Sequence, residues 1–437
     1  MSFYRTRNVR VAFRRWLVGI GLILVACSPS QLPPVPAQTP TTVDTDEAEA
    51  RALVGALAAG SADAAAANFS QRMRLALPPQ LLLSQWQGLQ ARHGTLSSWR
   101  VVNRDHPSEK DRFTIELVFS QRVIYCVVVL EPSSHEVVGL FFLKTQQGPQ
   151  SGDHSDPTVH EDTLSVGPLA LPARWAVPAA GSRPLPAALL VSGSGANDHD
   201  ESVADAKPFR DLAYGLAKRG IATLRYDNRS FAHPEASPDP GHSTVEDEVL
   251  IDAVAALQLL RKRPEVAPGR VFVVGHSLGA LLTPEIAQRG GGVAGLVLLA
   301  PPGRPLEQIV LEQLETAQPK ADFRPLERQV QSLPELPAAA PLLGMPAGYW
   351  RDLDRRDEMA TAAALGRPVL LLRGSMDRNI AAIDQERWSA SLSGRVSVKN
   401  ITLPGLNHLF LPATEVAGQR HFASEAVDTI AQFIQQP

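Results

Sequence analysis

The stretch Arg270-Val271-Phe272-Val273-Val274-Gly275-His276-Ser277-Leu278-Gly279-Ala280 decides the fold of this chain. Residues 271–274 are β-branched or aromatic, which is typical of a buried strand, and a helical pattern begins at Ala280. The pentapeptide 275–279 is therefore a turn between a strand and a helix. A G-x-S-x-G turn in this context presents its serine for nucleophilic attack, and its tightness requires small residues two positions before and after the serine. The structural alternative is a glycine-rich turn with a helix-capping serine.

Two later segments supply an acid and a base in the chain order that such a nucleophile requires. The apolar run Val369–Leu372 leads directly to a loop that contains Asp377, and the strand-like run Val396–Leu403 leads to a loop that contains His408. Both side chains are therefore expected just beyond the carboxyl ends of strands. Without a catalytic role, Asp377 would cap a helix and His408 would be an ordinary loop histidine.

Each of these three residues has a separate expected role. Ser277 would attack an acyl carbon, and His408 would take the serine proton and later return it to the leaving group. Asp377 would hold the tautomer of the imidazole and stabilise its charged form. Asp384, in a polar helix-like stretch, is the weaker alternative for the acid.

The negative oxygen of a tetrahedral intermediate needs hydrogen-bond donors. The Leu278 amide, directly after the nucleophile, is the first expected donor. The loop Val191-Ser192-Gly193-Ser194-Gly195-Ala196-Asn197-Asp198 follows another strand and consists mostly of small residues, so its backbone can approach a substrate closely. Ser194 or Gly195 is the expected second donor. A flexible glycine turn is the alternative interpretation of this loop.

Strand and helix patterns alternate from about residue 164 to the C-terminus, which predicts an α/β fold with a mostly parallel sheet and helices on both faces. In such folds, ligands bind beyond the carboxyl ends of the strands. Strands are expected at the positions that precede the candidate site residues, namely 187–191, 270–274, 369–372 and 396–403, and also at 221–226 and 293–300.

These motifs together resemble the α/β-hydrolase fold family, in particular its serine aminopeptidase-like and bacterial esterase group. The resemblance covers about residues 165–437 and also includes Pro284 after the elbow, Tyr226-Asp227-Asn228-Arg229 and Asn407-His408. Ser230 departs from the glycine that usually follows this arginine, which affects the expected local turn. Residues 301–367 form a long helical insertion, and because insertions at this position form a lid in this group, they are expected to cover the site.

The resemblance implies hydrolysis of carboxylic esters with small or medium acyl groups, with no metal or organic cofactor. Hydrolysis of peptides or amides by the same triad is the first alternative, because acyl transfer to serine serves both. A non-catalytic binding protein that keeps the fold is the second, because fold alone does not establish activity. Lid leucines with Met345, Tyr349 and Trp350 would either line an apolar pocket or simply pack.

The N-terminus is typical of an export signal, because a charged region precedes an apolar run, residues 16–26, that is too short to span a bilayer. Leu24-Val25-Ala26-Cys27 resembles the lipobox of bacterial lipoproteins, which implies acylation of Cys27 and a lipid-anchored position at the cell envelope. Ser28 in place of aspartate favours the outer membrane. A cleaved signal with an incidental cysteine is the alternative.

The chain divides into several predicted parts. Residues 1–27 form the signal, and the Pro- and Thr-rich residues 28–44 form a tether. Helical patterns followed by strand-like runs predict a small α+β domain at 45–145, which resembles a domain of unknown role that precedes the hydrolase in some exported bacterial esterases. A polar linker at 146–163 leads to the hydrolase domain at 164–437.

Composition adds two exclusions. The 437-residue chain has a formal net charge of -3, so it has no basic excess to bind nucleic acid. Its two cysteines are Cys27 and Cys126, and acylation of the first would leave no partner for an internal disulfide. Cys126 lies in an apolar run and is expected to be a small buried hydrophobe.

Overall fold

The computed structural model describes residues 44–105, 110–120, 123–143, 156–203, 206–233, 243–317, 322–413 and 421–436. The predicted export signal, Cys27 and the predicted tether up to residue 43 lie outside the described residues. Within this part of the chain, none of the helices combines the length and the apolar character needed to cross a bilayer. The buried apolar side chains form one core in the N-terminal part and a second core from residue 166 onward.

The N-terminal part is a four-stranded antiparallel sheet with helices, as predicted for 45–145. Along the second strand, every other residue is buried, and these positions include Phe113, Ile115 and Leu117. This period of two places one face of the sheet against the helices. Cys126 is buried in the same core, where burial raises the pKa of its thiol. The elements are α1 Thr45–Ala58, α2 Ala62–Ala65, α3 Gln71–Ala76, α4 Pro79–His93, β1 Leu96–Asp105, β2 Asp111–Phe119, β3 Val123–Leu130 and β4 Val137–Leu143.

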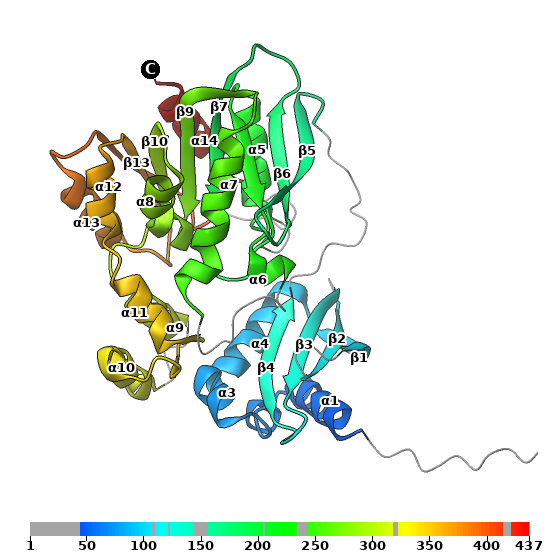
Figure 1. The fold of residues 1–437 in the computed structure, drawn as a ribbon. Helices are drawn as coiled ribbons and strands as arrows, with labels where there is room; N and C mark the ends of the chain where they lie inside the picture. The colour runs from blue at the N-terminus through cyan, green and yellow to red at the C-terminus, as the bar shows by residue number, and fades with distance from the viewer. Residues whose placement is uncertain are drawn as a thin grey trace, which may run out of the picture. The chain divides into compact units, whose positions relative to one another are not determined.

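The C-terminal part is built on an eight-stranded sheet in the order β14-β13-β10-β9-β7-β8-β6-β5 (Figure 1). The strands from β14 to β8 in this order are parallel, and β6 and β5 form an antiparallel pair at one edge. The α/β fold predicted from the alternating pattern is confirmed. The strands are β5 Val159–Val166, β6 Leu171–Pro178, β7 Leu185–Val191, β8 Ala222–Tyr226, β9 Val266–His276, β10 Gly295–Leu299, β13 Val369–Gly374 and β14 Val398–Leu403.

Strand β5 begins inside the range predicted as linker, 146–163. Its sequence, Val159-His160-Glu161-Asp162-Thr163-Leu164-Ser165-Val166, is mostly polar because the strand lies at the edge of the sheet and is largely accessible. An edge strand of this kind lacks the apolar run that marks the central strands.

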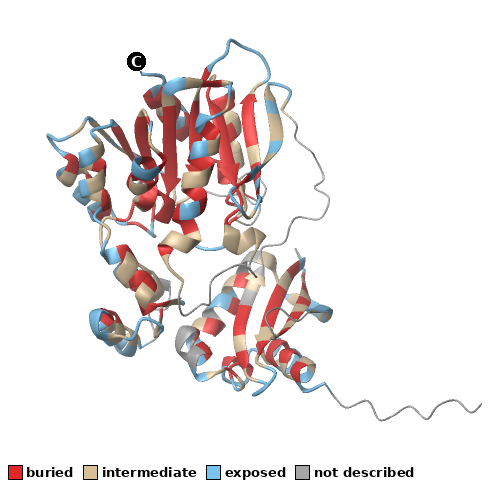
Figure 2. Ribbon diagram, in the orientation of Figure 1, coloured by how far each residue is buried: buried red, intermediate tan, exposed pale blue. Residues whose placement is uncertain are grey.

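Helices cover both faces of the large sheet (Figure 1). Helices α7 Ile251–Arg261 and α8 Leu278–Gly290 pack together on one face, and α5 Pro208–Ala217 packs with α14 Ser424–Gln435 on the other. Because both faces are covered, central strands such as β10 are buried along their whole length (Figure 2). A Cβ atom at Gly215 would lie 2.7 Å from Val427, so glycine is what allows α5 and α14 to approach this closely.

The order of the strands reverses direction at β7. The chain runs from β7 to β8 on one side and then crosses to β9 on the other side of β7. The loops that follow β7 and β9 therefore leave neighbouring strand ends in opposite directions, which is the usual position of a ligand site in an open parallel sheet. These are the loops of Ser194 and Ser277.

The insertion after β10 contains more regular structure than its sequence predicts. Helices α9 Leu306–Ala317 and α10 Arg324–Gln331 form its first part. The proline-rich stretch that follows contains a short 3-10 helix, Leu333–Glu335, and the β11–β12 hairpin, Pro341–Leu342 and Met345–Pro346. Two further helices, α11 Ala347–Asp354 and α12 Glu358–Leu365, follow, and α12 packs against α8. The last part of the predicted lid thus belongs to the helical layer over the sheet.

A buried ion network joins the edge of the large sheet to the loop after β7. Arg225 on β8 is 1% exposed and pairs with Asp200 at 3.0 Å and with Glu161 on β5 at 2.8 Å. Burial alone would raise the pKa of Asp200, but the charges of Arg225, His199 and Lys207 hold it at about 2. Because this pKa lies below the value of about 3.9 for an unfolded aspartate, the stabilisation is present above that pH and is lost as pH falls toward 2.

We expect Arg225→Met to lower the free energy of unfolding at pH 7 by about 3–5 kcal/mol, because it leaves the buried Asp200 carboxylate without its main partner. Urea unfolding followed by tryptophan fluorescence measures this. The matched control is Arg324→Met, which removes an exposed ion pair with Asp322 and should change stability little. Equal stability of the two variants would contradict the role assigned to Arg225.

Candidate active site

Ser277 lies on a strained turn between β9 and α8. Its φ of 53° and ψ of -118° place a non-glycine residue in a region that L-amino acids rarely adopt. The backbone packs closely around this turn. A Cβ at Gly275 would overlap the Gly279 carbonyl, and a Cβ at Gly279 would overlap the carbonyls of Val191 and Ser192. The glycines on both sides of Ser277 are therefore required by close packing, as the sequence predicted.

The loop after β7 lies directly against the nucleophile turn. A Cβ built at Gly193 would lie 3.1 Å from the Cβ of Ser277. The Ser192 hydroxyl donates to the side-chain oxygen of Asn228 at 2.9 Å, and the Asn228 amide donates to the Gly195 carbonyl at 3.0 Å. These contacts hold the loop in place beside Ser277.

The backbone amides on both sides of Ser194 donate hydrogen bonds to carboxylates. The Gly193 amide donates to Glu201 at 2.8 Å, and the Gly195 amide donates to Glu248. Of the two sequence-predicted residues, Ser194 is therefore better placed than Gly195 to offer a free amide. Leu278 is the first residue of α8, and amides in the first turn of a helix have no acceptor within the helix.

The predicted acid and base are brought together. His408 Nδ1 lies 2.9 Å from Asp377 Oδ2, and the other carboxylate oxygen of Asp377 accepts the amides of Asn379 and Ile380. Burial raises the pKa of Asp377, but the bonds with His408 and these amides outweigh burial and lower it overall. Asp377 is thus a charged acceptor that orients the imidazole of His408.

The alternative acid, Asp384, has a different role. Its carboxylate accepts the Gly303 amide at 3.0 Å and pairs with Arg304 at 3.1 Å, so it anchors the start of the insertion. The side chain is fully buried by these partners. The structure therefore brings Asp377, and not Asp384, to His408.

His276, which precedes Ser277, has contacts that the sequence did not reveal. Its Nδ1 lies 2.8 Å from Glu201, and its Nε2 lies 3.0 Å from the backbone carbonyl of His408. Both His276 and Glu201 are 4% exposed. Glu201 stands in the polar stretch Asp198-His199-Asp200-Glu201, in which no spacing distinguishes it from its neighbours.

The insertion contacts the site region through Tyr349. Its hydroxyl donates at 2.6 Å to Glu248, which lies in a π-helical segment, Glu246–Leu250. Burial raises the pKa of Glu248, although the bonds from Tyr349 and the Gly195 amide oppose this. Trp350 is also buried, and its indole donates to the Leu342 carbonyl. Tyr349 and Trp350 are therefore packing residues of the insertion.

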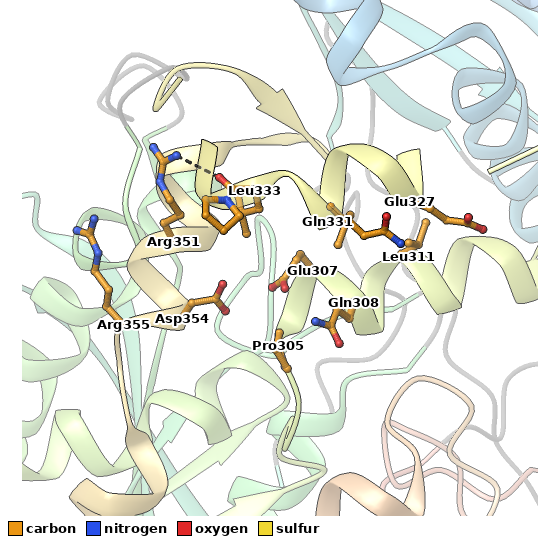
Figure 3. Close-up of a pocket in the computed structure, with 12 residues that line it drawn as sticks. Pro305, Glu307, Gln308, Leu311, Glu327, Gln331, Leu333, Arg351, Asp354 and Arg355 are labelled. Carbon is orange, nitrogen blue, oxygen red and sulfur yellow. Dashed lines mark hydrogen bonds between the residues drawn. The ribbon is translucent and has the colours of Figure 1, made fainter. Parts of the chain in front are cut away.

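A cavity of about 670 Å³ lies within the insertion, between α9, α10 and α11 (Figure 3). The residues that line it include Leu311 and Leu333, but not Met345, Tyr349 or Trp350. Figure 3 shows the carboxylates of Glu307 and Asp354 turned toward each other. Burial raises the pKa of Glu307 to about 7, and the charge of Asp354 adds to this. Among the residues that the structure describes, no group of three or more acidic, histidine or cysteine side chains is placed to hold a metal ion.

The chain is similar to known proteins over most of its length. The Alpha/beta hydrolase family matches residues 159–419. Esterase EstD of Thermotoga maritima is 36% identical over 381 residues, which cover 84% of this chain and 89% of that protein. Two solved structures are more distant. Est1E of Butyrivibrio proteoclasticus has 17% identity and a TM-score of 0.42, and it covers 62% of this chain and 95% of its own. The esterase domain of a Rhodothermus marinus protein has 16% identity and a TM-score of 0.39, with coverages of 63% and 95%.

We expect a fluorophosphonate probe to label Ser277, because this side chain is partly exposed and a serine activated by a general base attacks an electrophilic phosphorus. Mass spectrometry of the labelled peptide identifies the site. Ser277→Ala should abolish labelling, and His408→Asn should slow it by about 10²- to 10⁴-fold through loss of the base.

The control for this labelling is Ser375→Ala. Ser375 also follows a strand close to Asp377, but its hydroxyl accepts the Gly405 amide at 2.8 Å. This variant should be labelled at the normal rate. Labelling that persists in Ser277→Ala would show that another residue is the nucleophile.

Proposed function

Because the chain belongs to the alpha/beta hydrolase family, we propose that it is a serine hydrolase that cleaves carboxylic esters with small or medium acyl groups. The observation that carries this proposal is the pairing of His408 with Asp377 at 2.9 Å. These residues follow strands of the same sheet that has Ser277 on a strained turn after β9. The similarity to a protein named as an esterase, over most of both chains, supports esters as the substrate class.

In the proposed reaction, Ser277 Oγ attacks the ester carbonyl carbon while His408 Nε2 takes the hydroxyl proton. The resulting tetrahedral intermediate collapses when the bond between carbon and the alkoxy oxygen breaks, and His408 returns the proton to the leaving alcohol. Water then attacks the acyl-enzyme by the same sequence of proton transfers and releases the acid. Asp377 remains ionised throughout and stabilises the imidazolium form of His408.

The negative oxygen of each intermediate would be bound by the backbone amides of Leu278 and Ser194. Leu278 contributes an amide in the first turn of α8, where the helix dipole also favours negative charge. Ser194 contributes the amide between those of Gly193 and Gly195, which are engaged by carboxylates. Loss of one such donor typically slows catalysis by about 10²- to 10³-fold, so the geometry of this loop matters for the rate.

We expect the purified protein to hydrolyse p-nitrophenyl butyrate with a higher kcat/KM than alanine p-nitroanilide, because the named relative is an esterase. In Ser277→Ala, kcat/KM for the ester should fall by about 10⁴-fold or more. An unchanged urea midpoint would show that the variant folds. Faster cleavage of the anilide would instead favour a peptidase, and full activity of Ser277→Ala would exclude the proposed nucleophile.

We also propose that the protein is a lipoprotein of the bacterial cell envelope, anchored through Cys27, with the outer membrane favoured by Ser28. The support is in the sequence: basic residues, a short apolar run and Leu24-Val25-Ala26-Cys27. Acylation with at least two chains would hold the protein stably on a membrane surface. The ester substrate would then be one that reaches the envelope.

We expect Cys27→Ser to move the protein from the membrane fraction to the soluble fraction when it is expressed in a bacterium, because the variant has no thiol to acylate. Ultracentrifugation and immunoblotting measure this distribution. Cys126→Ser is the matched control, since this thiol is buried in the N-terminal core and its loss should not affect fractionation. Membrane retention of Cys27→Ser would argue against a lipid anchor.

A further inference from the structure

We propose that Glu201 holds His276 as an imidazolium. This buried ion pair positions two loops relative to each other, the loop that carries His408 and the loop after β7 that carries Ser194. The inference rests on the proposed function and adds His276 and Glu201 to it as positioning residues. Neither is a member of the triad, and neither is assigned contact with the substrate.

The protonation state follows from counting donors and acceptors. A backbone carbonyl can only accept, so His276 Nε2 must carry a hydrogen to bond the His408 carbonyl at 3.0 Å. Glu201 Oε1 already accepts the Gly193 amide at 2.8 Å, and it meets His276 Nδ1 at the same distance. With this oxygen acting as an acceptor, Nδ1 also carries a hydrogen. An imidazole that donates from both nitrogens is positively charged.

The surroundings favour this charged pair over a neutral one. Burial by itself lowers the pKa of His276, but the charge and hydrogen bond of Glu201, with the His408 carbonyl and the charge of Asp377, raise it overall. Both partners are almost fully buried. A buried pair of opposite charges with additional hydrogen bonds is costly to disrupt, because removal of one charge leaves the other uncompensated.

The pair connects three loops that leave different strands. His276 ends β9, the His408 carbonyl belongs to the loop after β14, and Gly193 belongs to the loop after β7. Glu201 reaches its position with a φ of 50°, a left-handed conformation that is uncommon for glutamate. Such strain is maintained when the surrounding contacts compensate for it. The bonds from His276 and Gly193 are contacts of this kind.

The charge on His276 also acts on the catalytic base. The two imidazole rings lie 4.6 Å apart between centroids. The charged groups that face His408 are Asp377, His276 and Glu201. Burial is the main cause that lowers the pKa of His408, Asp377 opposes this, and the charge of His276 lowers it further. His408 thus remains a free base at lower pH than an ordinary histidine does.

Two variants of His276 separate the effect of its hydrogen bond to the His408 carbonyl from the effect of its charge. In His276→Gln, the amide nitrogen can occupy the place of Nε2 and still donate to the His408 carbonyl. In His276→Asn, the shorter side chain can donate only toward Glu201. Both variants remove the positive charge, so both should move the acid limb of the kcat/KM profile for p-nitrophenyl butyrate to higher pH.

Only His276→Asn should also lower kcat strongly at the pH optimum. Loss of the bond to His408 allows its loop to shift, and misplacement of a catalytic group by about 1 Å can slow catalysis by about 10²-fold. KM should change little, because neither residue is assigned a contact with substrate. The matched control is His199→Asn, which removes a different pair of the same loop, His199 with Asp227 at 2.5 Å, and should leave the acid limb unchanged.

An acid limb in His276→Gln identical to that of the wild type would overturn the electrostatic role of His276. Equal kcat values in the Asn and Gln variants would overturn the role of the hydrogen bond to the His408 carbonyl. Nitrogen-15 NMR of the histidine rings tests the charge without an activity assay. At pH 7, His276 should show hydrogens on both nitrogens in the wild type and lose one in Glu201→Gln. If the wild type cleaves no ester, the proposed function fails while the NMR result still decides the state of His276.

Discussion

The backbone packing around Ser277 is the constraint on which the rest of the site depends. Gly275 faces the Gly279 carbonyl, and Gly279 faces the carbonyls at the end of β7, so closely that a single Cβ atom would overlap them. The same close packing holds the loop after β7 against Ser277, whose φ of 53° is rare for a residue other than glycine. The strain is local, but it is supported by an extensively buried parallel sheet that cannot relax around it.

Charged side chains hold the loops around this turn. Asp377 orients His408 from one side, and the His276–Glu201 pair holds the backbone of the same loop from another. Glu201 and Glu248 accept hydrogen bonds from the amides that flank Ser194, so carboxylates fix the backbone of the loop after β7 on both sides of this residue. Through Tyr349, Glu248 also links this loop to the insertion. A displacement of Tyr349 in the insertion can therefore shift the loop after β7 through the two hydrogen bonds of Glu248.

The central strands and the order of Ser277, Asp377 and His408 were predictable, because buried parallel strands appear as apolar runs and the loops that follow them carry the polar residues. The start of strand β5 was assigned to the linker because an edge strand is partly exposed and its sequence is therefore polar. Helices α11 and α12 were missed because prolines and glycines interrupt the patterns before them. Glu201 was missed because nothing in a polar loop shows which carboxylate turns inward.

The sequence by itself determined the fold, the nucleophile turn and the identities of the candidate acid and base, because these depend on local pattern and on chain order. Only the tertiary structure showed that His408 pairs with Asp377 while Asp384 binds the Gly303 amide, and that His276 contacts both Glu201 and the His408 carbonyl. These choices depend on hydrogen bonds between residues far apart in the chain. Such bonds form because the loops after β7, β9, β13 and β14 all leave the sheet at the carboxyl ends of its parallel strands.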